Sequence, residues 1–274
     1  MTLDASLLAR AIPEGSMRYF AWLYSPKEKR DIIAALFLLE SELRDTANAP
    51  HDVAHIRLQW WRDEIGHITK GNAQHPATRV LQARHNGNID NSLFDSLILT
   101  TAQDIAHSTY ETDIELNQYL KGGMGTLLKL AAAYLNDAPT PTILATAEGI
   151  GAFIRQVETL RDLRTDVHHG RLYLPLHELD QLNIEYEALA AKEWSSAFVE
   201  WLKARCHQSL QQYTQLKDSL VKEEALTLRP LLILGALHEK LLSRLRTDPD
   251  NFNQRLELSA FDKLWTAWRA ARQH

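Results

Sequence analysis

The sequence predicts an all-α protein that forms one compact domain. Leucine, alanine and charged helix formers dominate its 274 residues, whereas valine and threonine never gather into the alternating runs typical of a half-buried strand. Apolar residues make up 45% of the chain and charged residues 24%, which is the mixture of an ordinary globular protein. No repeat, linker or low-complexity segment divides the chain. We therefore expect residues 1–274 to fold as a single domain of about ten helices.

Apolar periodicity and turn residues place the individual helices. Residues 1–14 read as a mildly apolar lead-in, and residues 27–47 as a long helix. The centre of that helix, residues 32–39, is apolar on nearly every side, which is typical of a helix in the middle of a bundle. Prolines and glycines mark the breaks, including a loop at 85–88 and a turn at 248–250. The other predicted helices span 16–24, 51–70, 75–83, 92–108, 113–135, 142–168, 176–182, 194–220, 224–245 and 258–272.

Three glycines, Gly122, Gly123 and Gly125, interrupt the helix predicted over residues 113–135. Each glycine inside a helix costs about 1 kcal/mol relative to alanine, so three of them require a reason. Two interpretations stay open. The structural one is close packing of another helix or a kink, and the functional one is a backbone that opens beside a ligand cavity.

Composition excludes several classes of function. The net charge is −5, so the chain has no general field that would attract nucleic acid. The longest apolar run, residues 32–39, is far shorter than the roughly 20 residues that span a bilayer. The first residues do not resemble a signal peptide. The single cysteine, Cys206, excludes an internal disulfide and suits a reducing compartment, so we expect a cytoplasmic protein.

The stretch most suggestive of function lies near the end of the helix predicted over 142–168. Glu158, Asp162 and Asp166 follow one another at four-residue steps, which places them on one face of a helix. A solvated acidic face is the plain interpretation. The segment before them is apolar and contains glycines, which favours an internal helix. Magnesium prefers a few carboxylates together with phosphate oxygens, and arginine suits phosphate, so a magnesium–phosphate site is the functional interpretation. The neighbouring arginines are Arg155, Arg161, Arg164 and Arg171.

Other constellations are weaker. His75, His168 and His169 lack the spacing of a zinc site. No segment matches a phosphate-binding P-loop. The adjacent Trp60 and Trp61 are expected to pack in the core or at an interface.

Four blocks of sequence resemble the squalene/phytoene synthase family. They are Pro26-x-x-x-Arg30, the segment RLQWWRDEI with the later His75-Pro76, the motif Tyr119-x-x-Gly122-x-x-Gly125, and Leu160-Arg161-Asp162-x-x-x-Asp166 followed by Gly170-Arg171-x-Tyr173-x-Pro175. The resemblance is strongest over residues 16–185, and the last block is the most specific.

The resemblance implies a single-domain isoprenoid-synthase-like helical bundle around a central cavity. Members of the family join two prenyl diphosphates head to head. Two Asp-x-x-x-Asp motifs on facing helices hold magnesium ions against the diphosphates, and the metal helps the diphosphate to leave. The implied partner is a prenyl diphosphate or another isoprenoid lipid, and NADPH is implied only if the product is of the squalene type.

The resemblance also implies roles for individual residues. Asp162, Asp166 and Tyr173 would be the catalytic residues. Arg161, Arg171 and Arg18 would bind the diphosphates. The metal ligands would be Asp162, Asp166, Glu158, Asp45 and Glu42.

The first aspartate motif departs from the family pattern. It should fall at 44–48, where this chain carries Arg44 and Asn48 in place of carboxylates. Glu42 and Asp45, three residues apart, would then hold one ion. The alternative is that Arg44 forms an ordinary helix salt bridge with Glu40. Three more positions depart from the family residues, namely Ser41 at an arginine position and Arg155 and Glu158 at amide positions.

This loss of one motif resembles a divergent branch of the family that includes the mitochondrial complex I assembly factor and its bacterial relatives. Two hypotheses follow. The first is a magnesium-dependent prenyltransferase of isoprenoid biosynthesis. The second is a non-catalytic protein that binds an isoprenoid lipid or acts with a protein partner as a respiratory complex I assembly factor. Because the ligands of both are apolar, peripheral contact with the inner membrane is expected.

Overall fold

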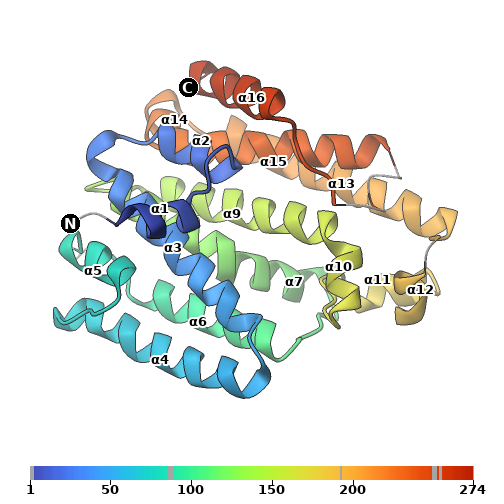
Figure 1. Ribbon diagram of the computed structural model, residues 1–274. Helices are drawn as coiled ribbons and strands as arrows, with labels where there is room; N and C mark the ends of the chain where they lie inside the picture. The colour runs from blue at the N-terminus through green and yellow to red at the C-terminus, as the bar shows by residue number, and fades with distance from the viewer. Residues whose placement is uncertain (1–2, 86–88, 192, 249–251, 253–254, 274) are drawn as a thin grey trace.

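The computed structural model describes residues 3–85, 89–191, 193–248, 252 and 255–273, and the architecture is entirely helical over those ranges (Figure 1). Its first half comprises α1 (Ala5–Ala11), α2 (Met17–Leu23), α3 (Arg30–Ala47), α4 (His51–Lys70), α5 (Pro76–Ala83), α6 (Ser92–Ile105), α7 (Asp113–Leu120), the π-helical segment η2 (Lys121–Gly125) and α8 (Thr126–Leu135). A short 3-10 turn, η1 (Lys27–Lys29), leads into α3.

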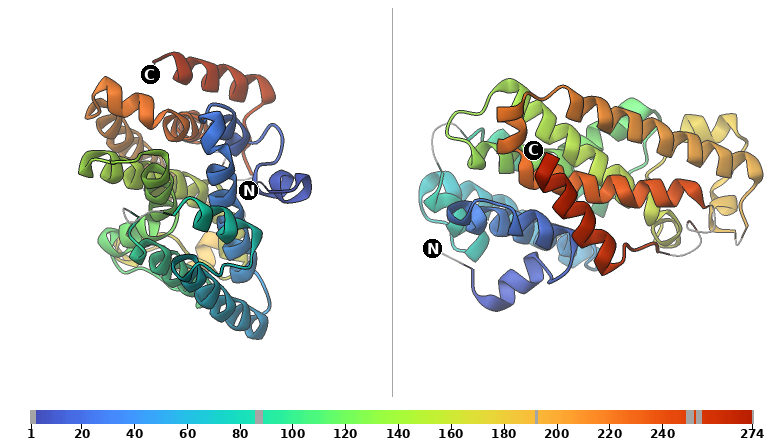
Figure 2. Two further views of the ribbon diagram at one scale, coloured as in Figure 1. Left: turned by 90° about the vertical axis from the view of Figure 1, so that its left-hand side faces the viewer. Right: turned by 90° about the horizontal axis from the view of Figure 1, so that it is seen from above.

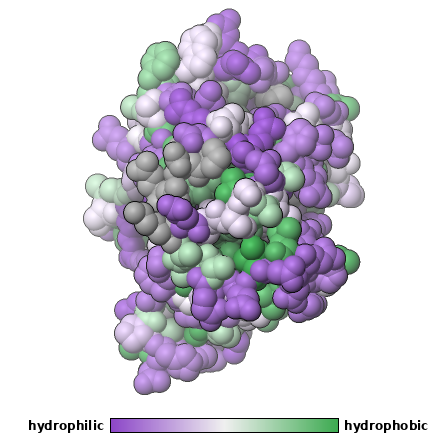
Figure 3. Space-filling model, turned by 90° about the vertical axis from the view of Figure 1, so that its right-hand side faces the viewer, coloured by the Kyte–Doolittle hydropathy of each residue, from purple (hydrophilic) through white to green (hydrophobic). Residues whose placement is uncertain are grey.

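The second half comprises α9 (Pro141–Arg161), α10 (Leu163–His168), α11 (Leu176–Gln181), α12 (Tyr186–Ala190), α13 (Ser196–Asp218), α14 (Lys222–Thr227), α15 (Arg229–Thr247) and α16 (Ala260–Gln273). The elements are stacked in layers, with α4 and α6 at one edge of the molecule and α16 at the opposite edge (Figures 1 and 2). At the end formed by α11, α12 and the start of α13, the surface is mostly hydrophilic with small hydrophobic patches (Figure 3).

Helix α3 lies in the middle of the bundle, as its sequence predicted. All eight residues from Ile32 to Leu39 are buried, and α3 packs against α1, α4, α5, α6 and α8. A helix surrounded in this way needs apolar side chains on every face, which explains its uninterrupted apolar run.

Helix α9 is the second central element. Thr140 caps its N-terminus by accepting a hydrogen bond from the amide of Ile143 at 3.1 Å, and Pro141 occupies its first turn. The helix packs against α8, η2, α13 and α15. A Cβ added to Gly151 would overlap the backbone of Met124 and Gly125, so this glycine lets α9 and η2 approach closely. The glycines of η2 therefore serve close packing, and Gly123 also lines a cavity.

The structure corrects several helix boundaries. The segment predicted as a lead-in contains α1, and α12 was not predicted. The helix predicted over 142–168 divides at Asp162, whose φ of −94° and ψ of 8° leave the helical region. The helix predicted over 224–245 divides into α14 and α15. Residues 86–88 of the predicted loop and 249–250 of the predicted turn lie outside the described residues.

Two further expectations concern particular side chains. The single cysteine, Cys206, is buried in α13. Trp61 is buried and Trp60 is 44% exposed, so only the first belongs to the core. None of the described helices is long and apolar enough to span a membrane.

Candidate functional site

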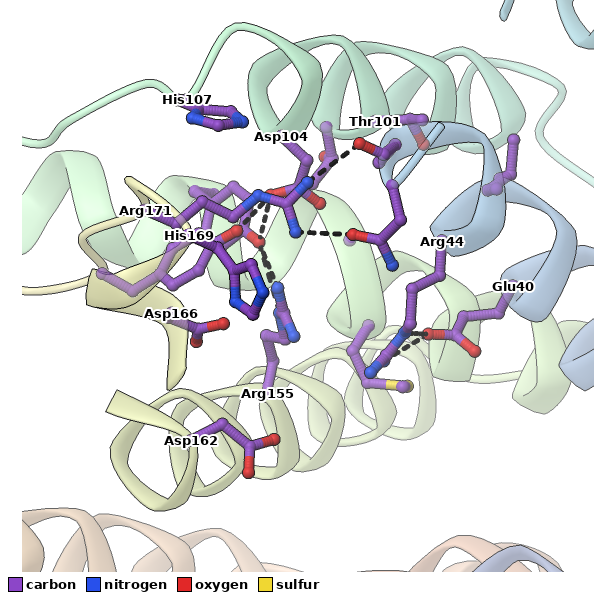
Figure 4. Close-up of a pocket in the computed structure, with 18 of the residues that line it drawn as sticks. Glu40, Arg44, Thr101, Asp104, His107, Arg155, Asp162, Asp166, His169 and Arg171 are labelled. Carbon is purple, nitrogen blue, oxygen red and sulfur yellow. Dashed lines mark hydrogen bonds and ion pairs between the residues drawn. The ribbon is translucent and has the colours of Figure 1, made fainter. Parts of the chain in front are cut away.

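A cavity of about 590 Å³ lies between the C-terminal ends of α3 and α9 (Figure 4). Helix α6 and the segment η2 close it from one side, and α10 with the loop that follows closes it from the other. Its walls combine charged groups with apolar ones. The charged and polar lining residues are Glu40, Arg44, Asn48, Asp104, His107, Arg155, Asp162, Asp166, His169 and Arg171, and the apolar or aromatic ones include Leu43, Leu97, Tyr119, Met124 and Tyr173.

Two predicted aspartates, Asp162 and Asp166, line this cavity together (Figure 4). The side chain of Asp162 is held by two arginines. Arg161 donates to both of its oxygens at 2.8 and 2.5 Å, and the Nε atom of Arg255 lies 3.2 Å from Oδ1. Asp166 makes no side-chain hydrogen bond or ion pair with another residue of the described ranges. It therefore remains open to a ligand.

The carboxyl group of Asp166 is electrostatically unusual. Its pKa is raised to about 6, chiefly by burial; the charge of Asp162 also raises the pKa, while Arg155 and Arg171 lower it. A carboxyl in this state gains more than an ordinary one from a cation placed beside it, because the cation would offset the cost of burial.

The facing wall of the cavity carries Arg44 instead of a carboxylate. Its Nε and Nη2 atoms donate to Oε1 of Glu40 at 2.9 and 2.5 Å, and Nη2 also lies 3.3 Å from Oε2 of Glu158 on α9. Burial alone would raise the pKa of Glu158, but Arg44 and then Arg155 hold that pKa well below its ordinary range. The predicted pair Arg44–Glu40 is thus present. It belongs to a network that joins α3 to α9.

A second group of residues, which the sequence analysis did not identify as a unit, anchors Arg155. The hydroxyls of Tyr119 and Tyr173 both donate to Oδ1 of Asp104, at 2.8 and 2.7 Å, and the two rings stack. Arg155 donates to the hydroxyl of Tyr119 at 2.7 Å and lies over the ring of Tyr173. The sequence offered one signal: Leu97, Thr101 and Asp104 share a face of α6, so the aspartate follows an apolar face.

Hydrogen bonds from Arg171 connect the loop after α10 to the end of α3. It donates from Nη1 to the side-chain oxygen of Asn48 at 2.7 Å and from Nη2 to the carbonyl of Ala47 at 2.9 Å. Its Nε atom is buried and has no hydrogen-bond partner among the described residues. Arg44, Arg155 and Arg171 together give this cavity three guanidinium groups.

Four of the five remaining predicted residues line a second cavity of about 410 Å³ on the other side of Arg44. Arg18, Arg161 and Glu158 line it, and Arg18 donates to Glu40 at 2.5 Å. Asp45 lies at its wall, where it pairs with Arg10. Arg10 also pairs with Glu42 at 2.6 Å. The structure therefore brings Asp162 and Asp166 together but separates them from Glu42 and Asp45.

Only one side of the first cavity carries side chains that suit a magnesium ion. Two carboxylates one turn apart, Asp162 and Asp166, suit an ion that completes its shell with phosphate oxygens and water. The α3 side offers Arg44 and the amide of Asn48, which is already bound to Arg171. Over the described ranges, no three His, Cys, Asp or Glu side chains come together as a metal site.

Comparison with known sequences supports the resemblance. The sequence profile described as "Squalene/phytoene synthase" matches residues 13–262. The chain is 29% identical over 170 residues to a phytoene synthase of Mycobacterium tuberculosis, covering 61% of this chain and 55% of that protein. It is 23% identical over 251 residues to the chloroplastic phytoene synthase 1 of Solanum lycopersicum, covering 88% of this chain and 61% of that protein. The chain therefore spans somewhat more than half the length of these relatives.

Two solved structures share the fold. A dehydrosqualene synthase in complex with ligand superposes with a TM-score of 0.83 at 16% identity, covering 98% of this chain and 95% of that one. The squalene synthase HpnC from Alicyclobacillus acidocaldarius superposes with a TM-score of 0.74 at 17% identity, covering 92% of this chain and 97% of that one. The predicted isoprenoid-synthase-like helical fold is thereby confirmed.

Proposed function

Because the chain belongs to the squalene/phytoene synthase family, we propose that it binds prenyl diphosphates in the first cavity and transfers prenyl groups head to head. The observation that carries the proposal is the pairing of two carboxylates, Asp162 and Asp166, with three guanidinium groups around one partly apolar space. Guanidinium groups bind phosphate oxygens with paired, charge-assisted hydrogen bonds. The apolar and aromatic part of the lining would receive the start of the prenyl chain.

Each lining residue has a specific task in this proposal. Asp162 and Asp166 would hold one magnesium ion, which would supply charge neutralisation for the departing diphosphate. Arg171 would bind the diphosphate through the guanidinium hydrogens that its bonds to Asn48 and Ala47 leave free. Tyr173, with Tyr119, would keep Arg155 in place through the shared bond to Asp104. Arg161 would orient Asp162 through its hydrogen bonds to both carboxylate oxygens.

The proposal also covers the use of NADPH, the role of Arg18 and contact with a membrane. NADPH would be consumed only if the product is of the squalene type. Arg18 would reach a diphosphate only from the second cavity, whose wall it forms. Substrates and products of this kind are apolar, so the proposal includes peripheral contact with a membrane.

A second function is favoured by one specific observation. Arg44 pairs with Glu158 across the place where the family motif would put carboxylates. Losing part of the electrostatic stabilisation of a leaving group commonly costs several kcal/mol of barrier. The alternative is therefore a protein that binds an isoprenoid lipid without turnover, as a lipid-binding protein or a respiratory complex I assembly factor.

Binding of the diphosphate is tested by replacing Arg171. Titrating farnesyl diphosphate into the wild type by calorimetry should give saturable binding in the presence of Mg²⁺. Arg171→Met should weaken that binding roughly tenfold to a hundredfold, because a charge-assisted hydrogen bond contributes about 1.5–3 kcal/mol.

The matched control is Arg84→Met. Arg84 also forms a long-range contact, to Asp31 at 3.4 Å, but it lies outside both cavities. Its replacement should leave the affinity unchanged. Equal losses in the two variants, or no binding by the wild type, would rule out the proposed site.

A further inference from the structure

We propose that the Arg44 guanidinium does on the α3 side what a bound metal ion would do there, so that the diphosphate binds this wall without metal. This inference rests on the proposed function and concerns the same cavity. It follows from the difference between the two walls. The α9–α10 side carries Asp162 and Asp166, whereas the α3 side carries Arg44, paired with Glu40 (Figure 4).

Arg44 is held in place from two helices. Glu40, one turn before it on α3, accepts from two of its nitrogens, and Glu158 on α9 lies 3.3 Å from one of them. A metal ion between facing carboxylates would join the same two helices. The guanidinium thus supplies both the positive charge and the link between α3 and α9 with groups of the protein itself.

Arg44 also has donor capacity left for a ligand. Its Nη1 atom makes no hydrogen bond to any residue within the described ranges, and its side chain is 39% exposed. The residue lines both cavities, as do Glu40 and Met124. An anion in the first cavity would therefore meet Arg44 on one wall and Arg171 on the other.

The surrounding charges explain why this cation stays in place. Arg44 contacts both of the largely buried glutamates, whereas Arg18 contacts only Glu40 and Arg155 contacts only Glu158. Within this group of five side chains, two carboxylates against three guanidinium groups leave one positive charge around Arg44. A phosphate ligand fits that balance, whereas a divalent cation beside Arg44 would be repelled.

The test compares binding with and without metal. Farnesyl diphosphate and inorganic pyrophosphate are titrated into the wild type in Mg²⁺ and in EDTA. We expect binding in EDTA to be weakened by less than about tenfold, because Arg44 and Arg171 still hold the anion. Arg44→Met should abolish the binding that remains in EDTA. Arg44→Lys keeps the positive charge but lacks the paired donors of a guanidinium, so it should retain part of that binding.

The double variant Arg44→Asp with Asn48→Asp places two carboxylates one turn apart on the α3 wall. Its affinity for both probes should become dependent on Mg²⁺, and EDTA should remove it. Thermal unfolding shows whether each variant folds. If Arg44→Met and the double variant do not fold, the affinity of Arg44→Lys in EDTA tests the inference. Wild-type binding that vanishes in EDTA overturns the inference but leaves the proposed function intact. Absence of binding in every condition overturns both.

We also infer, from a separate observation, that α16 docks the protein on an anionic lipid surface. The apolar stripe of α16 consists of Phe261, Leu264, Trp265 and Trp268, which are 73%, 57%, 51% and 40% exposed. Their spacing puts them on one face, while Ala267 and Ala270 are buried on the other. The helix lies at the outer edge of the molecule in Figure 1 and in the left view of Figure 2, and it faces the viewer in the view from above (Figure 2).

Charge points to a lipid surface as the occupant. Arg269 and Arg272 are exposed beside the stripe, and the Arg272 guanidinium lies over the ring of Trp268 at 4.8 Å. The one acidic residue of α16, Asp262, is already paired with Arg244 at 2.8 Å. Tryptophan and arginine together suit the boundary between headgroups and acyl chains.

Vesicle co-sedimentation tests this surface. The wild type should bind vesicles that contain phosphatidylglycerol more strongly than vesicles of phosphatidylcholine alone. Trp265→Ser with Trp268→Ser should reduce binding at least about tenfold, since burial of each indole contributes more than 1.4 kcal/mol. The matched control is Ile56→Ser with Trp60→Ser on α4, where the two side chains are 73% and 44% exposed. Binding that follows the α4 variant, no binding, or a dimer that the α16 variant dissolves would contradict the inference.

Discussion

At the scale of single residues, the site depends on which buried charges find partners. Glu40 and Glu158 are each contacted by two arginines or more, and the pKa of each is lowered despite the opposing effect of burial. Asp166 lacks such a partner, and burial raises its pKa to about 6. From this difference in pKa, we expect the charge of Asp166 to be stabilised by a bound ligand rather than by the protein.

This difference predicts how stability depends on pH. Because the folded-state pKa of Asp166 is raised to about 6, the folded state binds this proton more tightly than the unfolded chain does. Stability from this group is therefore complete below about pH 4 and is lost as pH rises to about 6. Asp166→Asn should raise the free energy of unfolding by about 1–2 kcal/mol at pH 7.5, less than the full shift because water reaches the side chain.

Urea unfolding at several pH values measures this effect. The difference between Asp166→Asn and the wild type should shrink toward zero near pH 4. The exposed Asp180→Asn serves as the control and should show no such trend. A variant Asp166→Asn that is equally or less stable at every pH would show that this carboxyl carries no burial cost.

At the scale of the elements, the two central helices were predictable because the side chains of each reflect what packs around it. The apolar run 32–39 indicated the position of α3, and the apolar, glycine-containing segment before Glu158 indicated that α9 is internal. The break at Asp162 was not predictable, because the i, i+4 spacing of the carboxylates continues across it. Short helices such as α1 and α12 depend on tertiary contacts, which local propensity does not report.

The same limit applies to the site. The four-residue spacing singled out Asp162 and Asp166, and the family resemblance implied that Arg44 and Asn48 face them; all four line the first cavity. It did not reveal that Arg44 pairs with Glu158, because the two residues are 114 positions apart. The shared bond of Tyr119 and Tyr173 to Asp104 is long-range in the same way. Roles that depend on a partner from another helix require the fold.

At the scale of the whole molecule, the fold is that of the family's solved structures, and the two walls of the first cavity carry different charged groups. The fold superposes on a dehydrosqualene synthase over 98% of this chain. Arg44 and Glu40 line both cavities, so the ion-pair network around Arg44 lies between the first cavity and the second. The central question is therefore whether one carboxylate wall suffices for transfer or supports binding only.

The most direct measurement is turnover by the purified protein. Farnesyl and geranylgeranyl diphosphate are incubated separately with the protein and Mg²⁺, with and without NADPH, and diphosphate release and hydrocarbon products are followed. The proposed function predicts release of diphosphate, a product of twice the chain length, and loss of both in Asp162→Ala. Bound substrate that shows no release, even at enzyme concentrations equal to substrate, would contradict transfer and leave lipid binding as the function.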